Sequence, residues 1–371
     1  MKKFVLDSFK QSIQYFFMFD EIIKKEAINK DAFLKDIGIN PSSYRRARTT
    51  EQKVGMQIIE SLANYYDINL ITIDEINEDE KFLNELFFDI NYKVYDKYFY
   101  YLEEIENKIN KRNLFFPIYK LFKLLLLINS QKDVEKIIQN NIDLFCEVKK
   151  FELFFGDSLV DVYELVCLAF ANDISKDMMS KKHNNGMAYA IIATKFRLKN
   201  NFFESLYYAK KAKEVFLQES NYKRVIYINF TILNNLSLVF DYEEYYNLAH
   251  EQLLTLRSFS ESGFETEMTI KHLVVAALAL KKYDEVKKIL LEKGKMTISE
   301  ICCLIIAIYN LSPSDFDEWC MNNIDGIAIK QKDKELIENL KIYLKNPDKK
   351  NLIPLEDSRI MTSLINILKW A

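Results

Sequence analysis

Residues 42–48 hold the side chains of this sequence that are best suited to contacting a nucleic acid. The segment contains two serines, a tyrosine and three arginines: Ser42, Ser43, Tyr44, Arg45, Arg46 and Arg48. Short hydroxyl side chains at a helix N-terminus can reach base edges, and guanidinium groups can read guanine or clamp phosphate oxygens. We therefore predict that these six residues contact double-stranded DNA.

Two short helices separated by Gly38 are expected to position these side chains. Asn29 or Asp31 can cap the first helix, and Asn40-Pro41 or Ser42 can open the second. Gly38 supplies the turn, where a positive φ is cheap for glycine. If the helices cross, five residues face inward: Phe33, Ile37, Ile39, Tyr44 and Ala47. A further helix is expected from residues 49–51 to about Tyr66.

The composition favours an all-α chain. Apolar residues make up 49% of the 371 residues, so a substantial core is possible, whereas there are only 7 Gly and 5 Pro. A β-sandwich or a nucleotide-binding α/β fold needs many turns or glycine loops. Their scarcity favours long helices joined by short polar loops.

A repeated pattern marks the second half of the chain. Asn201-Phe202-Phe203-Glu204-Ser205 is echoed at Asp241 to Tyr245 and at Lys282 to Val286, with spacings of 40 and 41 residues. Weaker echoes occur at residues 130–134 and 314–319. Each echo follows an apolar segment and a polar turn, so each is expected to open the second helix of a pair.

The expected domains follow from these patterns. Residues 1–73 form the helix-turn-helix domain, and residues 74–110 form an acidic linker (74–80) with a connecting helix whose apolar stripe runs from Leu83 to Ile109. That helix or the C-terminal tail can form a dimer interface. Residues 111–345 form the repeat domain, and residues 346–371 form a C-terminal capping helix.

The echoes resemble the tetratricopeptide repeat, whose second helix opens with an aromatic–acidic–acidic–small sequence. Ser205 and Ala212 match two of its small positions, and the resemblance covers roughly residues 110–345, although the period exceeds the usual ~34 residues. It implies a right-handed α-solenoid. Residues 33–48, with the helix expected around Val54 to Ala63, resemble the phage-repressor-like helix-turn-helix family.

Together, the two halves resemble the peptide-pheromone-responsive regulators of Gram-positive bacteria and their phages, which include the Rgg, PlcR and PrgX types and the arbitrium receptors. The resemblance implies a homodimer that binds paired DNA half-sites. It also implies that a short linear signalling peptide binds the protein and controls this DNA binding in quorum sensing. Groove-lining helices supply six candidate peptide contacts: Thr194, Arg197, Asn229, Asn234, Asn235 and Lys271. Asparagine side chains can both donate to and accept from a peptide backbone.

Other chemistry is not indicated by the sequence. Its three histidines (His183, His250 and His272) are isolated, and no zinc, Walker, Rossmann or nucleophile-elbow motif occurs. We expect no enzyme activity, metal or cofactor. The five cysteines lie in apolar surroundings and are predicted to be buried thiols of a cytoplasmic protein, and no apolar run is long enough for a membrane span.

A second function class stays open. The N-terminal bundle could grip a protein instead of DNA, as in Rap-type inhibitors of response-regulator signalling. The chain would then be a non-DNA-binding tetratricopeptide-like scaffold that sequesters a protein partner under peptide control. The arginine face at Arg45, Arg46 and Arg48 discriminates between the two functions.

Overall fold

The computed structural model describes residues 4–10, 12–26, 29–49, 53–93, 96–130, 134–172, 185–259, 263–324, 330–348 and two leucines, 364 and 368. All regular elements within these ranges are helices, which confirms the predicted all-α class. The chain forms two compact units: Met1–Lys195 with Lys210–Val225, and Phe196–Ala209 with Ile226–Ala371.

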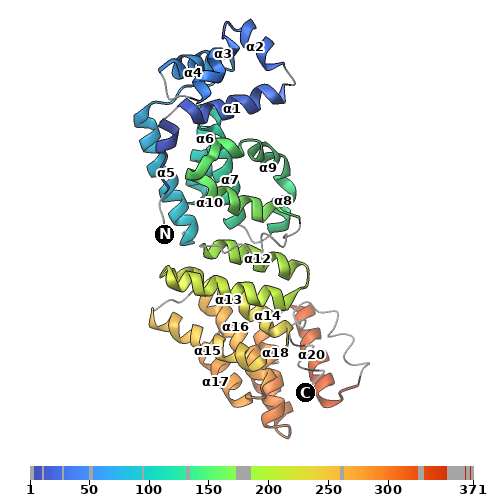
Figure 1. Ribbon diagram of the computed structural model, residues 1–371. Helices are drawn as coiled ribbons and strands as arrows, with labels where there is room; N and C mark the ends of the chain where they lie inside the picture. Colours follow the sequence, from blue (N-terminus) through green and yellow to red (C-terminus); the bar gives the residue numbers. More distant parts are fainter. Residues whose placement is uncertain are drawn as a thin grey trace. The chain divides into compact units, whose positions relative to one another are not determined.

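The first unit begins with a small group of helices. These are the 3-10 helix η1 (Asp7–Lys10), α1 (Ser12–Lys25), α2 (Lys30–Asp36), α3 (Pro41–Thr49) and α4 (Lys53–Tyr65). Figure 1 shows α2, α3 and α4 gathered beside α1. Asn29 caps α2, and Gly38 has a φ of 78° between α2 and α3, as the sequence predicts.

The inward face of α2 and α3 is also confirmed. Phe33, Ile39, Tyr44 and Ala47 are buried, and Ile37 is half-buried. Tyr44 meets Phe16 of α1 edge-on, with ring centroids 4.9 Å apart. These contacts fix the direction in which the rest of α3 points.

The predicted acidic linker at residues 74–80 is wrong, because this segment is the start of a 19-residue helix, α5 (Ile73–Asn91). Thr72 and Glu75 form a capping box, and acidic residues in a first helical turn are favoured by the helix dipole. Ile76 and Asp79 are buried. The boundary expected at residue 73 therefore falls inside the first unit.

The residues predicted to form one connecting helix form two helices, joined as a hairpin. Their stripe is divided between α5 and α6 (Tyr98–Asn110), and Lys93 between them has a φ of 56°. Lys108 Nζ lies 2.6 Å from Asp79 Oδ1, and the Tyr101 hydroxyl donates to Asp89 at 2.6 Å. The stripe is therefore buried within the unit along much of its length.

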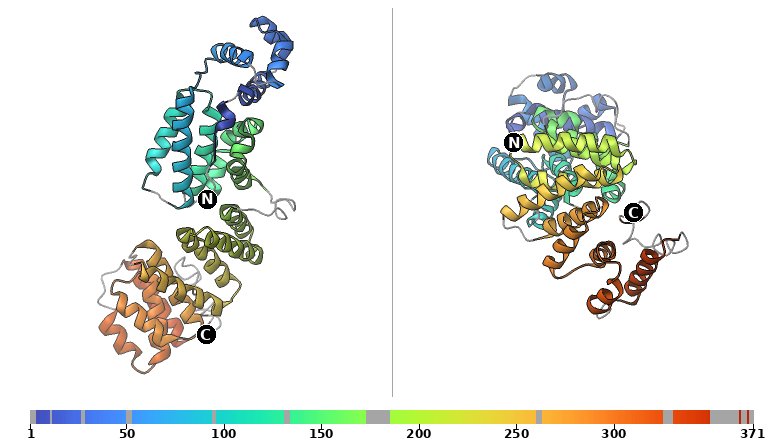
Figure 2. Two further views of the ribbon diagram at one scale, coloured as in Figure 1. Left: turned by 60° about the vertical axis from the view of Figure 1, so that its left-hand side comes forward. Right: turned by 90° about the horizontal axis from the view of Figure 1, so that it is seen from below.

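The rest of the first unit packs around one apolar helix, α7 (Phe116–Ser130). It contacts α5, α6, α8 (Val134–Asn140), α9 (Ile142–Lys149) and α10 (Glu152–Phe170). Figure 2 shows this group from a second side. The next helices, α12 (Gly186–Leu198), α13 (Phe202–Gln218) and α14 (Tyr222–Leu238), each contribute residues to both units.

Successive helices build the second unit. They are α15 (Tyr242–Ser258), α16 (Phe264–Ala279), α17 (Tyr283–Lys293), α18 (Ile298–Leu311), α19 (Phe316–Asn323) and α20 (Gln331–Lys345). The echoed motifs do open helices α13, α15 and α17. Their equivalent positions Ser205, Tyr245 and Val286 are 0%, 2% and 0% exposed, which supports the predicted register.

The turns before these three helices share one conformation. Asn200, Phe240 and Lys281 have φ values of 60°, 62° and 59°. The N–H group after each of them donates to a carbonyl five residues earlier, at 2.9, 3.1 and 2.9 Å. This hydrogen bond ends a helix and reverses the chain. The repeated element is therefore a local backbone motif as well as a sequence pattern.

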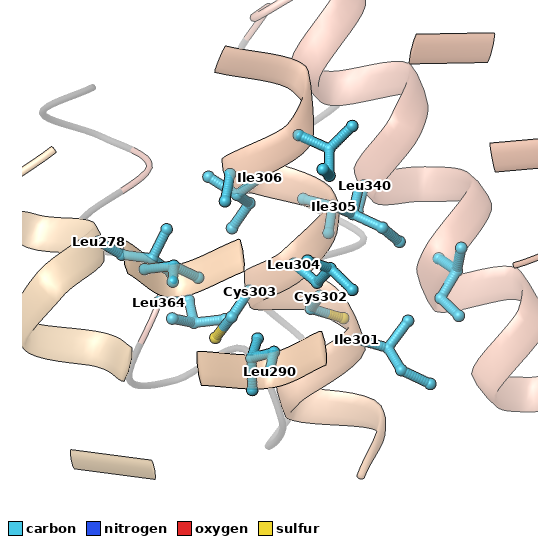
Figure 3. Packing of buried hydrophobic residues seen from close by; sticks show 14 of the residues in the cluster. Leu278, Leu290, Ile301, Cys302, Cys303, Leu304, Ile305, Ile306, Leu340 and Leu364 are labelled. Atoms are coloured by element: carbon cyan, nitrogen blue, oxygen red, sulfur yellow. The ribbon is translucent and has the colours of Figure 1, made fainter. Parts of the chain in front are cut away.

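A second core surrounds α18 (Figure 3). Ile301 to Ile308 are all buried, together with Leu278, Leu290 and Leu340 from neighbouring helices. Cys302, Cys303 and Cys320 are buried free thiols, and burial raises the pKa of Cys302 to about 12. The prediction of burial is wrong for Cys146, which is exposed, and Cys167 is half-buried.

The predicted C-terminal cap lies mostly outside the described residues. Of its tail, Leu364 and Leu368 are described, and both are buried in the core around α18. His183 also lies outside the described ranges.

Candidate functional site

The outer face of α3 presents most of the residues predicted to contact DNA. Ser42, Arg45 and Arg46 are exposed, and Ser43 and Arg48 are half-buried. Asn40 Oδ1 accepts hydrogen bonds from the Ser42 backbone N–H at 2.9 Å and from its hydroxyl at 2.8 Å. This bond satisfies one of the otherwise unpaired N–H groups at the start of α3.

Tyr44 corrects the predicted DNA-contact set, because its side chain is fully buried. Its hydroxyl donates to Asp20 Oδ1 of α1 at 2.5 Å. Burial, followed by this hydrogen bond, raises the pKa of Tyr44. The residue thus anchors α3 to α1, and it cannot reach DNA in this conformation.

Arg45 and Arg48 form ion pairs with acidic residues of the same helical group. Arg45 pairs with Asp31 of α2, and both side chains are exposed. Arg48 lies 2.9 Å from Asp20 Oδ2, and its guanidinium lies 5.2 Å from the centre of the Phe17 ring. Arg48 is therefore turned partly inward, although the sequence predicts that it points outward.

The polar residues predicted to contact a peptide fall into two groups. Arg197 and Asn234 are exposed, whereas Thr194 and Lys271 are half-buried. The Thr194 hydroxyl donates to the Ala190 carbonyl within its own helix at 3.0 Å. Thr194 belongs to the first unit and the other five residues belong to the second.

Asn229 and Asn235 are buried, so they do not form an open groove wall. Asn235 Nδ2 donates to the Ser205 hydroxyl at 2.7 Å, and this bond joins α14 to the start of α13. The Oδ1 atoms of both asparagines are buried without a hydrogen-bond partner among the described residues. Native proteins rarely leave buried polar atoms unpaired.

Sequence reasoning missed a second polar pair, between α15 and α16. Gln252 and Thr269 are buried, and Gln252 Nε2 donates to the Thr269 hydroxyl at 3.0 Å. Within the described parts of the chain, Gln252 Oε1 also has no partner. A signal was present in the sequence, since both residues interrupt apolar positions of predicted repeat helices.

Aromatic side chains connect α14 and α16 in the same unit. The Phe230 ring stacks on His272 with centroids 5.9 Å apart, and the Tyr227 hydroxyl donates to Glu265 at 2.7 Å. His272 Nδ1 also shares a 2.8 Å hydrogen bond with the Tyr245 hydroxyl. Burial lowers the pKa of His272 to about 4, so the imidazole is neutral at pH 7.

No group of three or more His, Cys, Asp or Glu side chains in the described ranges is arranged to hold a metal ion. None of the helices that the structure describes is long and apolar enough to cross a bilayer.

Comparison with protein-family models, with curated proteins and with solved structures gives no match to this chain.

Proposed function

We propose that this chain is a cytoplasmic, non-enzymatic DNA-binding transcription regulator under peptide control. The observation that carries the proposal is the exposed face of α3, with Ser42, Arg45 and Arg46 outward. Tyr44 and Ala47 are buried beneath it, so the polar face is held in a fixed direction. Two short helices with a glycine turn and such a face suit a helix-turn-helix that enters the major groove.

The charges of α3 suit DNA in two ways. Arginine side chains can contact guanine edges or phosphate oxygens, and the N-terminus of a helix attracts phosphate. The ion pair between Arg45 and Asp31 is exposed, so little free energy is lost when the guanidinium turns to a phosphate. Arg45 and Arg46 are therefore the strongest candidates for direct contact.

The second part of the proposal assigns peptide sensing to the repeat helices, arranged as a right-handed solenoid of tetratricopeptide-like hairpins. Asn234 and Arg197 are accessible to a peptide, and Lys271 is partly so. The side-chain oxygens of Asn229 and Gln252 have no hydrogen-bond partner among the described residues, and peptide N–H groups can satisfy them if the helices separate slightly. A homodimer that binds paired half-sites would couple peptide binding to DNA release or capture.

The DNA test is a gel-shift titration with the promoter region upstream of the chain's own gene. We expect Arg45→Ala combined with Arg46→Ala to weaken binding, with a reduced salt dependence because fewer phosphates are neutralised. Lys24→Ala is the matched control, since Lys24 is an exposed cation on α1 outside the face of α3. Unchanged affinity of the double variant contradicts the DNA proposal.

One observation favours a second function, that of a Rap-like scaffold that holds a protein partner under peptide control. Arg45 and Arg48 already neutralise Asp31 and Asp20, which lowers the positive potential of the face. The scaffold function is supported if the wild-type protein fails to shift its promoter region but retains one protein partner. That partner should be lost when the arginines are replaced.

A further inference from the structure

A cleft of about 460 Å³ lies within the first unit, between the N-terminal helices and α6, α7 and α9. Its apolar lining comes from Ile22, Ile68, Ile109, Phe116 and Phe151. The Phe116 and Phe151 rings meet edge-on at 5.7 Å. A volume of this size suits a small organic ligand.

Backbone hydrogen bonds hold the two walls of this cleft together. The Asn69 N–H, just after α4, donates to the Arg112 carbonyl at 3.0 Å. The Leu114 N–H donates back to the Asn69 carbonyl at 3.1 Å. Ile68 and Arg112, which both line the cleft, are therefore fixed by a two-way bridge between the walls.

The charged lining carries four cations, Lys25, Arg112, Lys120 and Lys150, and three carboxylates, Glu21, Glu26 and Glu147. Each carboxylate has a partner: Glu21 lies 3.7 Å from Lys24, Glu26 accepts from Tyr66 at 3.3 Å, and Glu147 lies 2.6 Å from Lys120.

Three cations of the lining make no ion pair with any residue that the structure describes: Lys25, Arg112 and Lys150. The pKa of the Glu147 carboxyl is lowered by a hydrogen bond from Lys120, and Lys25 and Lys150 add to this effect. Two unpaired ammonium groups therefore lie close to an already neutralised pair, and Arg112 adds a third charge to the cleft.

We propose that this cleft binds a small organic anion, a carboxylate attached to an aromatic or branched apolar body. The apolar body would pack on Phe116, Phe151 and Ile109. The carboxylate would accept hydrogen bonds from Arg112, Lys25 or Lys150. Arginine and lysine donors to a carboxylate are stronger than neutral hydrogen bonds, and the apolar lining gains from excluding water.

The proposal does not depend on DNA binding. Its site has walls from α1 on one side and from α6, α7 and α9 on the other, so a bound anion would hold these elements together. Two sources supply the same chemistry: a free aryl or acyl acid, and the C-terminal residue of a peptide. None of the residues predicted for peptide sensing lines the cleft.

Calorimetric titration of the full chain with three probes tests the proposal. The probes are 3-phenylpropionate, N-acetyl-phenylalanine and the neutral N-acetyl-phenylalanine amide. We expect both acids to bind and the amide to bind at least about tenfold more weakly, because it lacks the charge. Tighter binding of N-acetyl-phenylalanine than of 3-phenylpropionate assigns the site to a peptide end, and equal binding assigns it to a free acid.

Charge-removing variants locate the site. Arg112→Gln and Lys150→Gln each remove an exposed cation, and each should weaken 3-phenylpropionate binding about three- to tenfold. Lys149→Gln is the control for Lys150→Gln, because Lys149 is the exposed residue directly before Lys150 but does not line the cleft. Its affinity for the probe should match that of the wild type.

Exposed positions were chosen so that the variants keep the fold, which circular dichroism and thermal melting verify. The proposal is overturned if neither acid binds at millimolar concentration, or if the amide binds as tightly as the acids. It is also overturned if Arg112→Gln and Lys150→Gln leave the affinity unchanged. These results leave the DNA proposal unaffected, since it is read out by gel shift.

Discussion

At the scale of single residues, Asp20 is the centre of the α1–α3 contact. Its carboxylate accepts the Tyr44 hydroxyl at 2.5 Å, and Lys30 Nζ and Arg48 Nη1 lie 2.5 and 2.9 Å away. Three donors thus converge on one half-buried carboxylate from α2 and α3. Such a network fixes orientation because each bond restrains a different helix.

Tyr44→Phe tests this network, since it keeps the ring and removes the hydroxyl. We expect a loss of about 1.5–3 kcal/mol in the free energy of unfolding, the usual range for a hydrogen bond to a charged group. Urea denaturation followed by circular dichroism measures it. Tyr65→Phe is the control, because Tyr65 is exposed and its hydroxyl makes no hydrogen bond to a described residue. Equal stability of the two variants contradicts the expected role of Tyr44.

His272 gives a prediction for the effect of pH on stability. Its pKa in the folded chain is about 4, compared with 6.5 for an ordinary histidine, because burial disfavours the imidazolium. The unfolded chain therefore takes up the proton first as the pH falls. The contribution of His272 to stability is complete above pH 6.5 and is lost between pH 6.5 and about 4. The loss amounts to roughly 3 kcal/mol at the most.

His272→Asn should flatten this part of the stability profile, since it keeps a hydrogen-bonding group near the Tyr245 hydroxyl but cannot titrate. Denaturant titrations at a series of pH values between 4 and 7 measure the effect. His250→Asn, which replaces a ring stacked on Tyr246, should keep the wild-type profile. A profile unchanged by His272→Asn would show that another group controls acid stability.

At the scale of elements, the end of α5 depends on α14. Arg224 is buried, and it donates from Nε to the Asn91 carbonyl at 2.8 Å and from Nη2 to the Ile90 carbonyl at 2.6 Å. Asn221 Nδ2 also donates to the Asn91 carbonyl at 3.0 Å. The last carbonyls of a helix have no partner within it, and a cation there is favoured by the helix dipole.

Arg224→Gln should therefore destabilise the first unit by about 2–4 kcal/mol, because buried carbonyl groups lose charged donors. In Arg224→Gln, backbone hydrogen exchange should be faster in the last turn of α5 than in its first turn. Lys223→Gln, at the neighbouring exposed position, should change stability by less than about 0.5 kcal/mol. If hydrogen exchange in the last turn of α5 is similar in the two variants, the end of α5 is stable without the Arg224 guanidinium group.

At the scale of the whole molecule, the proposed function divides DNA contact and peptide sensing between different helices. The residues proposed to contact DNA belong to the first unit, and most candidate peptide contacts belong to the second. A regulator of this kind needs a ligand that prefers one conformation of the dimer, because a ligand with equal affinity for both conformations shifts neither.

Asn234→Ala tests peptide sensing. Asn234 is exposed on α14, so the variant should fold normally. If the repeat helices bind a small peptide encoded beside the gene, as proposed, the variant should bind it roughly three- to tenfold more weakly. Calorimetry measures this affinity, and Asn107→Ala, an exposed asparagine of α6, serves as the control. Identical titrations for Asn234→Ala and the wild type remove this residue from the site.

The sequence by itself determined the features that depend on neighbouring residues. Scarce glycine and proline predicted an all-helical chain, and Gly38 and Asn29 predicted the turn and cap around α2. The echoes at Ser205, Tyr245 and Val286 predicted three equivalent helix starts, and these positions are indeed buried. Caps, turns and helical periodicity act over a few residues, so they can be read directly from the chain.

Only the tertiary structure decided which residues meet across the chain. The acidic segment after Thr72 starts with a local capping box, but only the tertiary structure shows that Asp79 is buried against Lys108 of α6 and Tyr119 of α7. Asn235 turned inward to Ser205, 30 residues away, and the hydroxyl of Tyr44, whose inward position the sequence predicted, found Asp20, 24 residues away. Lys25 and Lys150, which are far apart in the sequence, both line the cleft. Ion pairs, buried polar bonds and clefts depend on long-range packing, and sequence spacing alone carries no information about those distances.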